Sequence, residues 1–384
     1  MAMRVEAIVA GAGPAGSLAA MLLARRGWQV LLVDRGPAGR RKTCGHCLGP
    51  RAVPLLRRHG LLAAVQAIAE GFTRRLSVRA DGRRLIDTPI DLDSSSVKER
   101  GGGLVVDRRR LDPLLQEAAV AAGVEYVCPG VVVEPRLGDS LGSGVRVNVR
   151  TPGRAIAVEA RLLVAADGVG SGVARALGWA NAACAGRRFG VSFQCAGETV
   201  PTSALPPGTV SMRLRKEGYL GLVRQNDWVH AAALLRPGVE LEPALRAFAS
   251  DAEWLPSPTR GCSSLAGTGP LPWHATRMAA AGCALVGDAA GYAEPFTGEG
   301  MTWALESAEL LVGAIPERAS ERRFDTTAAA RYVERWQATI GAGQRRCRWL
   351  AQALDRPWLI AGVAAACRGF PPLAGQLVRS VVCA

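Results

Sequence analysis

The chain of 384 residues lacks the features that mark several other classes of protein. It has no apolar run of about 18 residues, the length needed to cross a bilayer. It has no phosphate-binding P-loop, no paired carboxylates at helical spacing and no Ser/His/Asp order, so we assign it neither phosphoryl transfer nor hydrolysis. Its 10 cysteines follow no repeating pattern. This excludes the disulfide framework of a small secreted domain and predicts a reducing, cytoplasmic location.

Lysine and histidine are scarce although the chain is strongly basic. Of the 47 Lys and Arg residues only three are lysines, Lys42, Lys98 and Lys216, and the formal net charge is +14. The arginines do not alternate with aromatic residues in one block, so we expect no nucleic-acid partner. The basic surface is either simply solvated, or it attracts a phosphorylated substrate, NAD(P)H, an acidic carrier protein or an anionic membrane face.

A glycine-rich segment near the N-terminus has the pattern of a dinucleotide-binding turn. It follows the apolar run 5–10 and opens a helical stretch over 14–26. Glycines let the backbone turn and approach a pyrophosphate, and the helix N-terminus supplies N–H donors and a positive dipole. A second strand over 29–33 ends at a carboxylate that can accept hydrogen bonds from a ribose. The residues predicted to bind a dinucleotide here are Gly11, Gly13, Ala15, Gly16 and Asp34.

Three further motifs follow in order: Arg108-Arg109-Arg110-Leu111-Asp112, Asp167-Gly168 and Gly287-Asp288. The last follows a short strand over 283–286 and precedes a glycine-rich loop over 295–300 and a helix over 301–315. The four motifs together resemble those of the p-hydroxybenzoate-hydroxylase-like flavoproteins, which implies that the cofactor is FAD. The resemblance places Asp288 on the ribityl chain, Arg108 on the FAD chain and the helix dipole at the flavin N1/O2 edge. The other cofactor contacts that it implies are Arg35, Arg41, Cys44, Asp167, Gly168, Gly287, Pro295, Gly298, Gly300 and Met301.

Within that superfamily, two segments resemble the geranylgeranyl-reductase-like branch of flavoprotein dehydrogenases. They are Arg41-Lys42-Thr43-Cys44-Gly45-His46-Cys47-Leu48-Gly49-Pro50 and the loop over 291–300. The resemblance makes Cys44, Tyr292 and Glu294 the catalytic candidates. Where that branch and the flavin halogenases carry tryptophan- and proline-bearing segments, this chain has Gly218-Tyr219-Leu220-Gly221-Leu222-Val223-Arg224, which argues against halogenation.

The Cys44-Gly45-His46-Cys47 segment leaves three interpretations open. Cys44 lines the active site, both cysteines are ordinary packed thiols, or the pair cycles as a disulfide. A disulfide reductase would need a second nucleotide-binding fingerprint, which the sequence lacks, and no second Cys/His pair completes a zinc site. We therefore predict no metal. The four histidines are isolated in the sequence and are expected to be structural, with His46 as the exception.

The resemblance and the pattern of elements predict an α/β fold. It consists of a Rossmann-like FAD-binding domain interleaved with an antiparallel β-sheet substrate domain and a C-terminal helical segment. We expect the FAD-binding domain over 1–72, 102–180 and 270–340, the substrate domain over 73–101 and 181–269, and a helical cap over 341–384.

The substrate domain is expected to roof the flavin. A hairpin is predicted over 73–90 and strands over 191–195, 209–214, 219–223 and 229–235. Tyr219 and Trp228 are predicted to line the substrate. The alternative to a C-terminal helix that caps this cavity is a weak contact with a membrane surface, which would make the protein membrane-peripheral.

We therefore predict an FAD-dependent oxidoreductase that acts on a small apolar molecule, isoprenoid or polyketide-like. The reaction is hydride transfer to or from a C=C or C–C bond at flavin N5, with NAD(P)H or a reduced-flavin or ferredoxin partner as electron donor. The alternative is an FAD-dependent monooxygenase that hydroxylates an aromatic or polyketide substrate through a flavin C4a-hydroperoxide. A flavin-carrying electron-transfer partner is the third interpretation.

Overall fold

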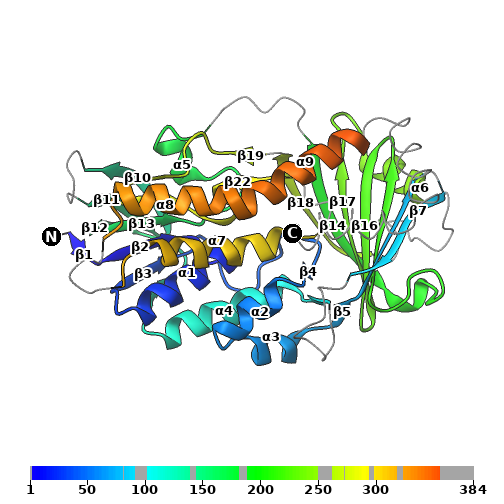
Figure 1. Ribbon diagram of the computed structural model, residues 1–384, viewed down its shortest axis with the longest axis horizontal. Coiled ribbons are helices and arrows are strands. Elements are labelled where there is room, and N and C mark those ends of the chain that lie inside the picture. Colours follow the sequence, from blue (N-terminus) through cyan, green and yellow to red (C-terminus); the bar gives the residue numbers. More distant parts are fainter. Residues whose placement is uncertain are drawn as a thin grey trace.

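The computed structural model describes residues 2–80, 82–90, 102–138, 144–180, 188–249, 262–271, 273–293, 298–317 and 323–354. Figure 1 shows an elongated molecule, with helices and several sheets at one end and a large sheet at the other. The fold is mixed α/β, as the sequence predicted.

A six-stranded sheet forms the centre of the nucleotide-binding part. Its order is β20-β21-β13-β2-β3-β9, and all neighbours are parallel except β20 and β21. All the strands are short, and all except β9 are wholly apolar because helices and a further sheet cover them, as parallel sheets require. The bounds are β2 (Ala7–Ala10), β3 (Val30–Val33), β9 (Glu125–Val127), β13 (Leu162–Ala165), β20 (Ala279–Ala280) and β21 (Cys283–Leu285).

Three helices of the nucleotide-binding part pack on one another and share one buried core with the six-stranded sheet. They are α1 (Pro14–Arg25), α4 (Arg108–Ala121) and α7 (Gly300–Ala314). A four-stranded sheet of order β1-β12-β11-β10 contributes valines to the same core. Its strands are β1 (Met3–Arg4), β10 (Val131–Leu137), β11 (Val145–Thr151) and β12 (Arg154–Ala160), and α5 (Gly172–Ala176) lies against β10.

The second large sheet has seven strands in the order β18-β14-β17-β16-β15-β6-β7. Apolar side chains of one face pack against α6 (Leu241–Ala249). The predicted antiparallel sheet is wrong at one place, because β6 and β15 run parallel. These two strands are joined through the nucleotide-binding part, so no hairpin fixes their relative direction. The bounds are β6 (Arg75–Ala80), β7 (Arg83–Pro89), β14 (Arg188–Ala196), β15 (Thr209–Arg215), β16 (Gly218–Gln225), β17 (Trp228–Leu235) and β18 (Cys262–Leu271).

Smaller elements connect the two parts. A three-stranded sheet of order β4-β8-β5 joins the segment after Cys44 to the segments that flank the first hairpin. Its strands are β4 (Cys47–Leu48), β5 (Gly71–Thr73) and β8 (Gly103–Val105). Between β4 and β5 the chain forms the helices α2 (Ala52–Arg58) and α3 (Leu62–Ile68). The remaining short elements are η1 (Gly197–Thr199), β19 (Trp273–His274), η2 (Gly287–Ala289) and β22 (Gly291–Tyr292).

A long helical stretch closes the described chain. It consists of α8 (Thr326–Trp336), the π-helical turn η4 (Gln337–Gly341) and α9 (Ala342–Leu354). Figure 1 shows it running along the nucleotide-binding part towards the seven-stranded sheet. The stretch continues across residue 340, the predicted boundary between the FAD-binding domain and the cap, and the domain limits stay a prediction. The predicted cap beyond residue 354 lies outside the described residues, and none of the described helices is long and apolar enough to cross a membrane.

Candidate active site

A cavity of about 1000 Å³ lies between the nucleotide-binding part and the seven-stranded sheet. This volume is at the upper end of the range for small-molecule sites. Both glycine-rich motifs open onto it, although they lie far apart in sequence. The predicted site residues that line it are Gly11, Gly13, Ala15, Asp34, Arg35, Arg41, Cys44, Arg108, Asp167, Gly168, Tyr219, Gly287, Asp288, Tyr292, Gly298, Gly300 and Met301.

The first glycine-rich loop leaves no room for side chains at two positions. A Cβ on Gly11, which has φ +104°, would lie 2.4 Å from the Ala166 carbonyl oxygen. A Cβ on Gly16 would lie 1.8 Å from the Gly11 carbonyl oxygen, so this glycine brings α1 against the strand and does not itself line the cavity. Gly13 differs, since its Cβ direction is open as far as the Arg108 Nη2 atom at 3.5 Å. A phosphate can therefore approach the start of α1 at Gly13.

Asp34 ends β3 with a buried carboxylate. Its Oδ2 accepts a hydrogen bond from the Ala12 N–H at 2.8 Å, and its Oδ1 accepts from the Gly36 N–H and from Arg40 Nη1, the latter at 2.5 Å. Burial by itself raises the pKa of Asp34, but these donors outweigh it and hold the pKa below its usual value. The carboxylate is thus charged and fixed at the cavity wall. A ribose hydroxyl has to share it with Arg40, a partner that the sequence did not reveal.

A cationic cluster stands in the middle of the cavity wall. Arg108, the first residue of α4, binds Asp112 through Nε at 2.6 Å and Nη2 at 2.8 Å. Lys42 Nζ binds the same carboxylate at 2.8 Å. Burial raises the pKa of Asp288 to about 6, and both cations oppose this rise. Arg108 and Lys42 place guanidinium and ammonium donors at the cavity wall, the groups that bind a diphosphate.

The predicted Asp167 contact has a different local role in the structure. Asp167 accepts hydrogen bonds from the Ser171 hydroxyl at 2.5 Å and from the Val173 N–H at 3.1 Å. The carboxylate therefore stabilises the start of α5 while it borders the cavity. Two further charged residues, Glu134 and Arg175, line this end. Sequence reasoning missed Glu134 because β10 carries no motif that points to a ligand.

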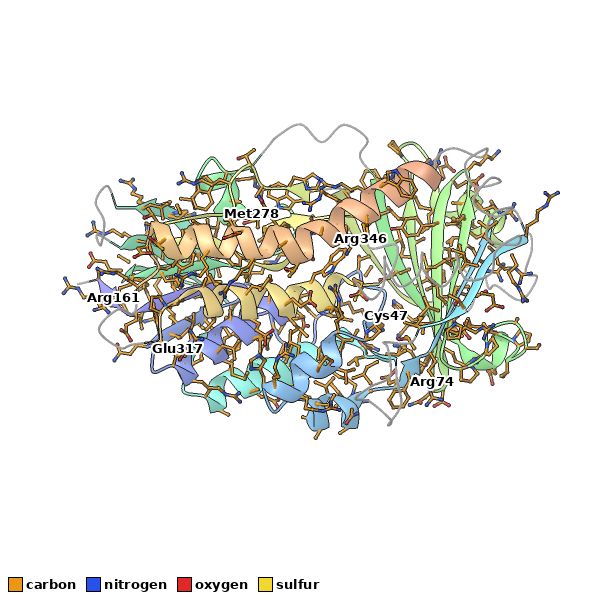
Figure 2. All side chains as sticks on the ribbon, viewed as in Figure 1. Cys47, Arg74, Arg161, Met278, Glu317 and Arg346 are labelled. Carbon is orange, nitrogen blue, oxygen red and sulfur yellow. The ribbon has the colours of Figure 1, made fainter. Side chains whose placement is uncertain are left out.

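The second glycine-rich loop brings α7 to the cavity. Gly287 has φ +58°, and Gly298 has φ +76° with its Cβ direction 2.9 Å from Cys47 Cβ. The close approach at Gly298 packs this loop against the Cys44–Cys47 segment. Figure 2 shows Cys47 between the helices of the nucleotide-binding part and the seven-stranded sheet. Glu294 and Pro295 lie outside the described residues.

Trp228 does not line the cavity, which corrects the prediction. It is 42% exposed and is the first residue of β17. The cavity contacts β17 only at Ala232, Ala233 and Leu234. Trp228 is therefore in the predicted strand but at the wrong end of it, whereas Tyr219 on β16 lines the cavity.

Glu299, next to the cavity loop, is a buried carboxyl group. Its side chain is 0% exposed, and Arg51 Nη2 is 3.5 Å from Oε2. Gly49 makes room for it, because a Cβ there would lie 2.0 Å from Oε1. Burial raises the pKa of Glu299 to about 8, with Arg51 opposing and Glu306 reinforcing the rise. The folded protein therefore holds this proton more tightly than the unfolded chain, and the resulting stability is lost as the pH rises towards 8.

A Glu299→Gln variant removes this titration. Between about pH 5.5 and 7.5 we expect the stability of the wild type to fall relative to the variant by roughly 1 kcal/mol per pH unit. Melting temperatures of both proteins across this range measure the difference. Parallel pH profiles would show that the Glu299 pKa is not raised.

The residues present fit FAD. Three features of the site suit this cofactor. They are the open backbone at Gly13, the cationic cluster of Arg108 and Lys42, and a second helix N-terminus at Gly300. Gly13 and the start of α1 would hold the phosphates of a dinucleotide, and the start of α7 at Gly300 would lie beside its ring system. The space beneath the seven-stranded sheet is then left for a second molecule.

A family model described as an FAD binding domain matches residues 4–212, more than half of the chain. The chain therefore belongs to this family, and it is an FAD-dependent oxidoreductase with the p-hydroxybenzoate-hydroxylase-like fold. This confirms the resemblance seen in the motifs.

Two curated relatives are reductases. Menaquinone reductase from Mycolicibacterium smegmatis is 30% identical over 331 residues, which cover 81% of this chain and 76% of that protein. Digeranylgeranylglycerophospholipid reductase 2 from Methanothermobacter thermautotrophicus is 27% identical over 365 residues, which cover 92% of this chain and 88% of that protein.

Solved structures share the fold at lower identity. A geranylgeranyl bacteriochlorophyll reductase-like protein from Thermoplasma acidophilum has a TM-score of 0.77 and 17% identity, covering 98% of this chain and 99% of that chain. PqsL, a probable FAD-dependent monooxygenase from Pseudomonas aeruginosa, has a TM-score of 0.73 and 23% identity, covering 94% and 99%. The flavin-dependent halogenase CmlS has a TM-score of 0.73 and 19% identity, and the match covers 92% of this chain but 64% of that chain.

Proposed function

We propose that this enzyme reduces a carbon–carbon double bond of an apolar substrate, isoprenoid or polyketide-like, by hydride transfer. The observation that carries the proposal is the division of the cavity by polarity. Among the described lining residues, every charged side chain belongs to the nucleotide-binding part. The seven-stranded sheet contributes apolar and small residues, among them Val210, Met212, Tyr219, Val223 and Leu234. Such a surface binds a hydrocarbon substrate and offers no charged partner to an ionic substrate.

The reaction adds a hydride to one carbon of the double bond and a proton to the other. Bound FAD, once reduced, supplies the hydride. Cys44, at the cavity wall, is proposed to supply the proton from its Sγ. Burial raises the pKa of Cys44, while Arg108 and the His46 N–H oppose the rise, so the group is a thiol at neutral pH and not a thiolate. Solvent then returns the proton to Cys44, and the cofactor is left oxidised.

Anaerobic turnover tests the proposal. The protein is reduced chemically without oxygen and mixed with menaquinone or with a digeranylgeranylglycerophospholipid, the substrates that the two relatives' names indicate. The expected result is return of the yellow colour of oxidised FAD and a product whose two added hydrogens lie on a carbon–carbon double bond of the isoprenoid chain and not on the quinone oxygens. A product that forms only after oxygen is admitted would overturn the proposal in favour of a monooxygenase. Oxidation only by a second protein would indicate an electron-transfer partner.

We also propose that NAD(P)H, or a reduced-flavin or ferredoxin protein, donates the electrons. The support is that the sequence shows no second glycine-rich nucleotide fingerprint, so we expect the donor to reach the flavin through the cavity described above. Bleaching of the flavin by NADH or NADPH alone, without oxygen, distinguishes a nucleotide donor from a protein donor.

A weak contact with a membrane surface is proposed as the way an apolar substrate arrives. The formal net charge of +14 supports an attraction to anionic lipid. Flotation of the protein with anionic vesicles at low and at high salt tests this. Protein that stays out of the vesicle fraction at low salt would contradict the proposal.

A further inference from the structure

A buried cluster of imidazole and amide side chains joins the Cys44 segment to the seven-stranded sheet. Its members are His46 next to Cys44, Gln194 on β14, Gln225 on β16 and His230 on β17, and all are buried. The two imidazole rings stack with their centroids 3.6 Å apart and their planes within 9°. Buried polar groups usually form hydrogen bonds with one another, and those of this cluster define its state, although His230 Nδ1 is buried without a partner among the described residues.

The direction of the hydrogen bonds follows from Arg109, which has only donors. Arg109 Nη2 donates to Gln194 Oε1 at 3.4 Å, so Gln194 Nε2 donates to Gln225 Oε1 at 3.1 Å. Gln225 Nε2 therefore donates to His46 Nδ1 at 2.8 Å. The His46 proton is on Nε2, which lies 3.9 Å from Asp107 Oδ1. Asp107 binds Arg109 through Nε at 2.7 Å, and this closes a ring of interactions.

His230 is fixed by the backbone of Cys44. Its Nε2 lies 2.6 Å from the Cys44 carbonyl oxygen, which can only accept, so Nε2 carries the proton. Burial lowers the pKa of His46 well below its usual value, and His230, Arg108 and Arg109 add to this effect. Burial also lowers the pKa of His230 to about 4, although the hydrogen bond to the Cys44 carbonyl opposes this fall. Both rings are therefore neutral at physiological pH, and stacking them brings no charges together.

Cys44 is held at two points by this cluster. His230 donates to its carbonyl oxygen, and the His46 backbone N–H donates to its Sγ at 3.3 Å. His46 has φ +57°, a left-handed conformation that costs free energy for a residue other than glycine. The stack with His230 and the hydrogen bond from Gln225 hold the His46 ring and thereby the turn that aims its N–H at the sulfur.

The cluster lies on the sheet face that also roofs the cavity. Side chains alternate along a strand, so His230, Ala232 and Leu234 of β17 share one face. His230 is in the cluster, while Ala232 and Leu234 line the cavity. On β16 the same alternation places Gln225 in the cluster and Tyr219 at the cavity. One end of the face docks on the Cys44 segment, and the other covers the substrate space.

We propose that His46, His230, Gln194 and Gln225 form a docking cluster that fixes the roof sheet on the Cys44 segment and positions the Cys44 thiol in the cavity. They are positioning residues, since they act through Cys44 and the sheet. Only one part of the proposal rests on the proposed function, namely that the Cys44 thiol takes part in turnover. The placement of the thiol itself can be measured without a substrate.

The test is the rate at which iodoacetamide alkylates Cys44 in the FAD-loaded protein, quantified at that residue by mass spectrometry. Gln225→Leu and His230→Leu are expected to raise this rate by about tenfold, because losing a buried hydrogen bond increases the open population by about that factor. His230→Gln keeps an N–H donor and is expected to restore a rate near that of the wild type. Gln66→Leu, the same exchange at an exposed position of α3, is the matched control and is expected to change nothing.

His46→Asn tests the cluster should the leucine variants fail to fold. Asparagine tolerates the left-handed conformation but removes the imidazole stack, so alkylation of Cys44 is expected to rise by about fivefold. Wild-type alkylation rates in His46→Asn and in the folded leucine variants, at normal FAD content, would overturn the proposal. A leucine effect that His230→Gln does not reverse would also overturn it. Failure of every candidate substrate to be reduced would instead count against the proposed function.

Discussion

A Gly13→Val variant is expected to fold and to lose FAD. Gly13 has φ −80° and ψ −173°, a conformation that valine adopts. Its Cβ would meet only Arg108 Nη2 at 3.5 Å and Lys42 Nζ at 4.0 Å. A Cβ at this position therefore clashes with nothing in the protein, and the valine side chain stands where the diphosphate approaches α1. We expect the affinity for FAD to fall by more than about 100-fold, which corresponds to roughly 2.7 kcal/mol.

Titration of the cofactor-free protein with FAD measures this loss. Gly313→Val is the control, because it makes the same exchange at an exposed position near the far end of α7, and we expect it to retain the affinity of the wild type. Melting temperatures of the two cofactor-free variants check that both fold. Wild-type affinity in a folded Gly13→Val protein would show that the phosphates do not lie at the start of α1.

A Cys44→Ala variant is expected to bind FAD normally and to turn over about 100-fold more slowly. The reason is loss of the proposed proton donor, since general acids contribute about 100-fold or more. Cys44→Ser is expected to recover part of the rate because a hydroxyl can also carry the proton. Anaerobic reduction of substrate gives kcat and KM, and the flavin spectrum reports cofactor binding independently.

Cys47→Ala is the matched comparison, because it removes the second thiol of the same motif. Burial raises the pKa of Cys47 to about 12, with Cys44 and Glu299 adding to the rise, and the thiol packs against Gly298. We expect this variant to keep most of its activity. Equal loss in both alanine variants would indicate a disulfide cycle, and unchanged turnover in Cys44→Ala would show that Cys44 is an ordinary packed thiol.

The parts of the site that the sequence predicted are those encoded over a few consecutive residues. Gly11 and Gly16 belong to a motif in which a Cβ would clash with the backbone, and Gly287 and Asp288 follow a strand that can be read directly. The family and the fold class were therefore predictable, because each motif is a local structure that repeats wherever a dinucleotide binds.

The remainder depends on which distant segments meet. That Arg40 binds Asp34, or that Gln194 and Gln225 meet His46, follows from strand register and not from any local pattern. Trp228 was placed in the correct strand, but the position of the cavity along β17 is set by the docking of the whole sheet. The parallel pairing of β6 with β15 has the same origin.

That parallel pairing imposes an order on folding during synthesis. The hairpin of β6 and β7 leaves the ribosome long before β15, the strand that completes its inner edge. Until then the backbone groups of β6 have no partner on that side, and an unpaired edge attracts strands of other chains. Contacts so far apart in sequence also form slowly. We therefore expect the nascent chain to be more prone to aggregation at this stage than the finished fold.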